Sequence, residues 1–187
     1  MGFKERFPLP IPIILIIAQV GLTAAIVGIE IRSIYIDLVH GTIWAGFWCG
    51  IIFVKTFLAM SCFVCCGRGR CCATYCLILN CISGILACVL IYFDQFLMNN
   101  LCKCYLGPQI CCTITGIGSF NSQLGQTAVN CTQQSIQGVY INQCPVYPSQ
   151  KYQLLQAQLG CSVGILITCI VYILTYIFAT LGICFGH

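Results

Sequence analysis

The chain has 187 residues, of which 59% are hydrophobic and only 6% are charged, and its formal net charge is +4. This composition excludes an ordinary soluble domain, in which about 25% of residues are charged. Four stretches carry almost no charge for about 20 residues each, which is long enough to cross a bilayer. We therefore expect an all-α integral membrane protein, a bundle of four transmembrane helices, with no nucleic acid among its partners.

The expected segments follow one another along the chain. Residues 1–10 are the N-terminus, 11–31 span 1, 32–42 a short outer loop, 43–64 span 2, 65–72 an inner loop, 73–96 span 3, 97–158 a large outer loop, 159–185 span 4 and 186–187 the C-terminus. An alternative is that the first apolar run, which follows Lys4, Glu5 and Arg6, is a signal peptide. Its length favours a retained span.

Basic residues predict the orientation. Four of them fall on one side of the expected membrane: Lys4, Arg6, Arg68 and Arg70. Short loops rich in Lys and Arg stay in the cytoplasm. Both termini are therefore expected to be cytoplasmic, and the expected location is the plasma membrane.

Small residues in the spans predict where helices pack. Gly21 and Gly28 lie in the first span, Gly46 and Gly50 form a Gly-xxx-Gly pair in the second, and Gly84 lies in the third. In lipid such positions let helix backbones approach closely. We expect them at contacts between helices, within one chain or between chains.

Polar side chains inside the spans are costly unless they are paired or hydrated. Gln19, Lys55 and Asn80 are expected at comparable depth. They could orient the helices through hydrogen bonds of about 1 kcal/mol each, or line a polar path. Alternatively, Lys55 could extend its stem to place the ammonium at the interface. Four further charges are expected at or near the outer surface, exposed: Glu30, Arg32, Asp37 and Asp94.

The inner loop is rich in cysteine. Cys65, Cys66, Cys71 and Cys72 flank a short basic segment, and Cys184 lies at the end of the last span. Cysteines beside basic residues at the membrane surface are typical S-palmitoylation sites, so covalent lipid is the expected modification. A zinc site is less favoured because the pairs lack Cys-x-x-Cys spacing. These cysteines could also serve simply as small apolar residues.

The large outer loop contains an even set of cysteines: Cys102, Cys104, Cys111, Cys112, Cys131 and Cys144. A small loop on the oxidising side of a membrane is stabilised by disulfides, so we expect a disulfide-tied loop whose pairing stays open. Asn130 begins the sequon Asn-Cys-Thr in the same loop, which is either a glycosylation site or an unused match.

Catalytic residues are sparse. His40 and His187 are the only histidines, and they lie far apart in the sequence. No histidine-based nucleophile system or multi-histidine metal site can be assembled from them. The expectation is therefore a protein that is not an enzyme and that needs no cofactor.

Two stretches resemble known four-span proteins. Gln19-Val20-Gly21 and the segment 43–50, Ile-Trp-Ala-Gly-Phe-Trp-Cys-Gly, resemble the membrane-spanning four-domains subfamily A and sarcospan group. The resemblance covers mainly the first three spans. It implies a non-enzymatic membrane protein that oligomerises or accompanies receptors and channels.

A second resemblance is to the tetraspanin superfamily and its L-six-like relatives. It rests on Cys111-Cys112 and on the inner cysteines. The pattern departs from that family because Thr113 stands where the tetraspanin Cys-Cys-Gly motif has glycine.

Together these features predict a protein that acts by lateral association. It would be an accessory subunit or an organiser of a larger complex, and its partners would be lipids, other integral membrane proteins or further copies of itself. The outer loop would then control recovery of the partner. The alternative is a pore or transporter subunit with a polar path near Lys55, Gln19 and Asn80.

Overall fold

The structure, a computed structural model, describes residues 9–36, 44–65, 69–99 and 149–185. Within these ranges the chain forms four α-helices: α2 (Pro10–Ile36), α3 (Ala45–Cys65), α4 (Arg70–Asn99) and α7 (Ser149–Phe185). All four are long and apolar enough to cross a membrane. The described part of the chain is therefore all-helical and has the four membrane spans of an integral membrane protein.

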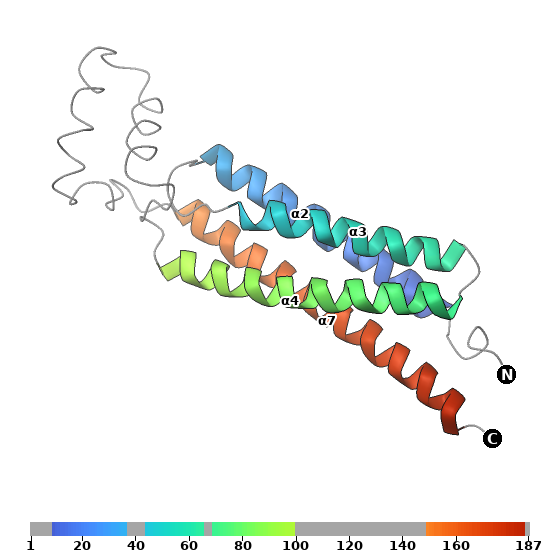
Figure 1. The fold of residues 1–187 in the computed structure, drawn as a ribbon. Helices are drawn as coiled ribbons and strands as arrows, with labels where there is room; N and C mark the ends of the chain where they lie inside the picture. The colour runs from blue at the N-terminus through green and yellow to red at the C-terminus, as the bar shows by residue number, and fades with distance from the viewer. Residues whose placement is uncertain (1–8, 37–43, 66–68, 100–148, 186–187) are drawn as a thin grey trace, which may run out of the picture.

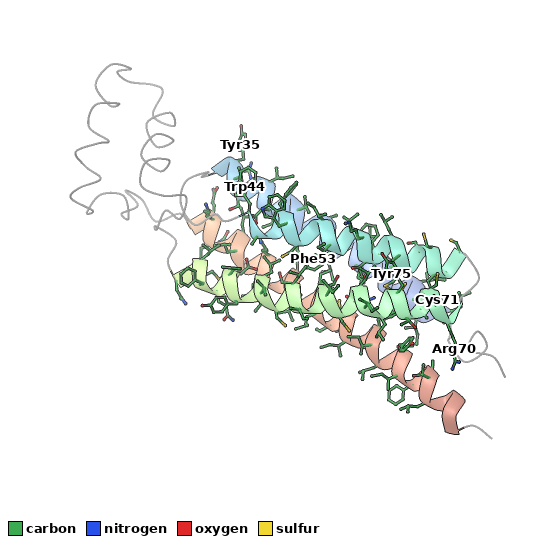
Figure 2. The ribbon with its side chains drawn as sticks, viewed as in Figure 1. Tyr35, Trp44, Phe53, Arg70, Cys71 and Tyr75 are labelled. Carbon is green, nitrogen blue, oxygen red and sulfur yellow. The ribbon has the colours of Figure 1, made fainter. Side chains whose placement is uncertain are left out.

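The helices lie alongside one another in an elongated bundle (Figure 1). Successive helices pack together, and α7 packs against both α2 and α4. We call the end where α2 begins and α7 finishes the Arg70 end. The opposite end, where α4 finishes and α7 begins, is the Lys151 end. Figure 2 shows Arg70 and Cys71 at the first end, with Tyr35 and Trp44 at the other.

Three of the helices extend beyond the apolar runs that predicted them. α2 continues to Ile36, α4 occupies 70–99, and α7 begins at Ser149, ten residues before the expected span. Pro10 is the first residue of α2, a position where proline fits because its missing N–H has no intrahelical partner. The added turns contain polar residues. The apolar runs therefore end before the helices do.

The interior consists of stacked apolar layers. One cluster, which includes Met60, Phe63 and Tyr172, lies toward the Arg70 end. A second lies between the middle of the bundle and the Lys151 end, and Leu97 and Leu155 form a small third group nearer that end. Large exposed apolar side chains, among them Ile85 and Phe178, cover the outside. Such a surface suits contact with lipid.

Glycines differ in what they contact. A Cβ atom at Gly46 would lie 2.9 Å from Gln158 Nε2, and one at Gly50 would lie 2.8 Å from Val27 Cγ2, so α3 approaches its neighbours closely at both positions. Gly84 makes ordinary contacts with α7. Gly21 and Gly28 have nothing within 4 Å among the described residues, so of the two expected alternatives they do not show close packing within the chain, and packing between chains stays a prediction.

Candidate functional site

Three acidic or basic side chains lie inside the bundle formed by the described residues. Glu30 is 6% exposed, Asp94 1% and Lys151 0%. The expectation that Glu30 and Asp94 are exposed is therefore wrong. Each lies four residues from a core residue on its own helix, and residues four apart share a helix face. Arg32 is exposed and lies 6.0 Å from the Tyr35 ring centroid, whereas Asp37 lies outside the described residues.

Polar contacts connect Glu30 and Asp94 to side chains of α7. Gln158 Nε2 donates to Glu30 Oε2 at 3.0 Å, and Lys151 interacts electrostatically with Glu30. The Ser162 hydroxyl lies within reach of the Asp94 carboxylate and of the Gln158 backbone oxygen, 2.9 Å away. We call Glu30, Asp94, Lys151 and Gln158 the charged cluster. It joins α2, α4 and α7.

The α3 backbone lies against this cluster. A Cβ atom at Gly46 would come within 3.0 Å of Glu30 Oε2 as well as 2.9 Å of Gln158 Nε2. Only glycine leaves room there for the hydrogen-bonded pair without a shift. Gly46 therefore adds α3 to the site, the one described helix that contributes no member of the charged cluster.

Two oxygens of the charged cluster lack hydrogen-bond donors. Asp94 Oδ2 and Gln158 Oε1 are buried and have no partner in the described part of the chain. A buried acceptor without a donor costs about 1–3 kcal/mol. Each of these oxygen atoms can accept a hydrogen bond or contact a cation.

A second polar cluster lies nearer the middle of the bundle. Gln19 Nε2 donates to Asn80 Oδ1 at 3.1 Å and to Thr168 Oγ1 at 3.3 Å. One turn after Asn80 on α4, the Ser83 hydroxyl lies 2.7 Å from the Thr56 hydroxyl of α3. We call Gln19, Asn80, Thr168, Thr56 and Ser83 the amide cluster. It ties all four helices together by interhelical hydrogen bonds.

Lys55 does not join the amide cluster. Its side chain is exposed on the outside of α3, and the neighbouring Thr56 is the residue that points inward. Ile51 and Leu58, about one turn away on either side, are exposed apolar residues. In the described ranges Lys55 makes no hydrogen bond or ion pair. An isolated cation therefore lies on an apolar helix face.

A layer of apolar side chains separates the two polar clusters. Ile26, Phe53, Leu90 and Ile165, one from each helix, are all at least 98% buried and belong to one packed cluster. Phe53 projects from α3 toward α4 in Figure 2. This layer interrupts the polar residues along the bundle, and Lys55 lies outside it. The geometry gives little support to a polar path that joins Lys55 with Gln19 and Asn80.

Cysteines gather at the Arg70 end. Cys65 is the last residue of α3, Cys71 and Cys72 lie in the first turn of α4, and all three are exposed free thiols. Cys66 and the side chain of Cys184 lie outside the described residues. No group of three His, Cys, Asp or Glu side chains in the described ranges could hold a metal ion.

The expected loop features fall in residues 100–148, outside the described part of the chain. They are the six cysteines Cys102, Cys104, Cys111, Cys112, Cys131 and Cys144 together with Asn130. No disulfide occurs among the ten cysteines that the structure describes. The disulfide-tied loop and its glycan stay predictions.

Comparison of the chain with protein-family models, curated proteins and solved structures found no match. The resemblance to the membrane-spanning four-domains subfamily A and sarcospan group, and the one to tetraspanins, therefore stay predictions. Any functional interpretation rests on the geometry of the four helices.

Proposed function

We propose that this chain is a non-enzymatic four-span membrane protein that associates laterally with another membrane protein, and that Lys55 on α3 contacts the partner. The observation that carries the proposal is the exposed side chain of Lys55 in the middle of a membrane span, where its ammonium has no hydrogen-bond or ion-pair partner among the described residues. The exposed apolar neighbours of Lys55 would form the rest of the contact.

The depth of Lys55 makes a lipid environment unfavourable. Lys55 is ten residues from either end of α3. At a rise of about 1.5 Å per residue it lies about 15 Å from each helix end. A lysine stem extends about 6 Å, so it does not bring the ammonium to the interface of an upright helix. An uncompensated cation at this depth costs about 3 kcal/mol on insertion scales.

The chemistry of Lys55 indicates the kind of partner. A carboxylate in a partner's membrane span would neutralise the ammonium, and charge-assisted hydrogen bonds are among the strongest polar contacts. A second copy of this chain offers no matching group in its described spans, because both Glu30 and Asp94 are buried. The proposed partner is therefore a different protein with an acidic residue inside its span.

Substitution of Lys55 tests this proposal. The protein is purified from native membranes in mild detergent, and mass spectrometry measures each co-purifying membrane protein per copy of the chain. Lys55→Met should lower recovery of the partner at least about tenfold, which corresponds to about 1.4 kcal/mol. Lys55→Arg should retain it, because arginine keeps the charge.

Ile85→Met is the control because it changes an exposed apolar residue on a different helix, α4, without altering charge. It should leave recovery unchanged. Equal recovery from wild type and Lys55→Met would contradict the proposed contact. The outer loop would then be the next region to substitute.

The topology and the modifications belong to the same proposal. We place both termini in the cytoplasm of a plasma-membrane protein, with the large loop outside, where it can carry disulfides and a glycan on Asn130. Lipid is proposed on Cys65, Cys66, Cys71, Cys72 and Cys184. The exposure of Cys65, Cys71 and Cys72 beside Arg70 supports acylation at the inner interface.

A further inference from the structure

We propose that the charged cluster binds one small monovalent metal cation between Asp94, Glu30 and the side-chain oxygen of Gln158. This site lies inside the bundle near the Lys151 end, and it is separate from the outward-facing Lys55. The proposal rests on three features of the cluster: its charge, its unpartnered oxygens and its surroundings.

The cluster has an imbalance of charge. Glu30 and Asp94 contribute two carboxylates, which interact electrostatically with each other, and Lys151 is the only buried cation in the described ranges. With all three ionised, the net charge of these buried side chains in the described ranges is one negative unit. Burial of an uncompensated charge costs several kcal/mol, and a single monovalent cation restores neutrality. A divalent ion would leave the cluster with one excess positive charge.

Unpartnered oxygens provide the ligands. Asp94 Oδ2 and Gln158 Oε1 have no hydrogen-bond partner, and the two side chains are at least 98% buried. The amide nitrogen of Gln158 already donates to Glu30, so the orientation of that side chain leaves its oxygen free. Hard metal cations prefer such carboxylate and carbonyl oxygens. The ligand set contains no sulfur or imidazole, which argues against a transition metal.

The three groups belong to one neighbourhood. Ser162, one turn after Gln158 on α7, reaches the Asp94 carboxylate, while Gln158 itself reaches Glu30. A cation held by these residues would connect α2, α4 and α7. Binding to the folded bundle alone would therefore stabilise it.

The surroundings define a binding site that is closed on one side. Glu30 lies six residues before the last residue of α2, about 9 Å along the helix from that end. On the other side, Ile26, Phe53 and Leu90 form the buried apolar layer. This apolar layer opposes passage of a cation from the site toward the amide cluster.

Thermal unfolding of the purified full-length protein tests the site, with sodium as the probe. Sodium chloride is compared with N-methyl-D-glucamine chloride at equal ionic strength, since the organic cation is too large for the site. We expect sodium at about ten times its Kd to raise the Tm of the wild type by about 5 °C. Asp94→Asn should remove this rise because it removes the negative charge without changing the shape of the side chain.

Lys55→Met serves as the control that separates this inference from the proposed function. It should keep the full sodium-dependent rise. Equal Tm values of the wild type in the two salts would overturn the proposal, and so would a rise of the same size in Asp94→Asn. If Asp94→Asn does not fold, binding of radioactive sodium to the wild type decides: one ion per chain supports the site, and no binding overturns it.

Discussion

Gly46 is the residue on which the geometry of the charged cluster depends most directly. Its missing side chain leaves the space in which Gln158 donates to Glu30. Gly28 provides a comparison, since it is a glycine within α2 that has nothing within 4 Å, whereas Gly46 lies in the first turn of α3. The two positions separate the effect of close packing from that of helix propensity.

We expect Gly46→Ala to destabilise the bundle by about 1–3 kcal/mol, because the new methyl group displaces the hydrogen-bonded pair. Gly28→Ala should be neutral or stabilising by up to about 1 kcal/mol, because alanine is the better helix former. Unfolding in detergent measures both changes. Equal effects of the two substitutions would show that α3 does not pack closely on the Glu30–Gln158 pair.

Sequence reasoning found some of the buried polar residues and missed others, for a physical reason. Gln19 and Asn80 lie within long apolar runs, so their burial and pairing could be expected. Glu30 and Asp94 lie near the ends of such runs, where hydropathy cannot distinguish an interior face from the interface. Only the spacing of four residues from Ile26 and Leu90 indicated that they face inward.

Lys55 shows that the sequence does not fix the direction in which a side chain points. Its depth could be read from the sequence, but its direction could not, because Lys55 and Thr56 differ by only one position, about 100° around a helix. The inward direction of Thr56 follows from packing against Ser83. Which face of α3 meets α4 is a property of the assembled bundle.

Helices α3 and α4 place two kinds of cysteine in different environments. Cys65, Cys71 and Cys72 are exposed at the Arg70 end, whereas Cys49 on α3 is buried near the charged cluster. Cys169 on α7 is also buried and packs in the apolar layer region. Their reactivities should differ accordingly.

We expect a maleimide reagent to modify Cys71 and Cys72 in membranes only after neutral hydroxylamine has cleaved their thioesters. Cys49 and Cys169 should react only after unfolding. Peptide mass spectrometry locates each modified thiol. Labelling of inside-out vesicles is compared with labelling of right-side-out vesicles to show on which side of the membrane each thiol lies. Labelling of Cys71 and Cys72 without hydroxylamine would contradict acylation, and labelling only from the outside would contradict the proposed orientation.

The elements themselves were largely predictable. Four apolar runs gave the number of spans and the all-helical class, because lipid leaves a backbone few ways to satisfy its hydrogen bonds. The start of α7 at Ser149 was harder to predict, because Lys151 and the glutamines that follow lower the local hydropathy. Burial of Lys151 beside Glu30 is a tertiary effect that no local pattern contains.

At the scale of the whole molecule, the polar interior and the lysine on the outside have different roles. The two buried clusters hold the four helices together, and the apolar layer between them opposes a continuous hydrophilic channel. Lys55 instead faces the surroundings of the bundle. This division favours a protein whose function lies in what it touches within the membrane.

Photocrosslinking in native membranes tests that central claim most directly. A photoreactive amino acid replaces Leu58, beside Lys55 on α3, or Ile85 on α4 as the control; the two positions are 52% and 65% exposed. We predict that position 58 forms a crosslink to a membrane span that contains Asp or Glu. Lys55→Met should abolish this crosslink, and position 85 should yield only lipid adducts. Lipid adducts alone at both positions would contradict lateral association through the Lys55 face.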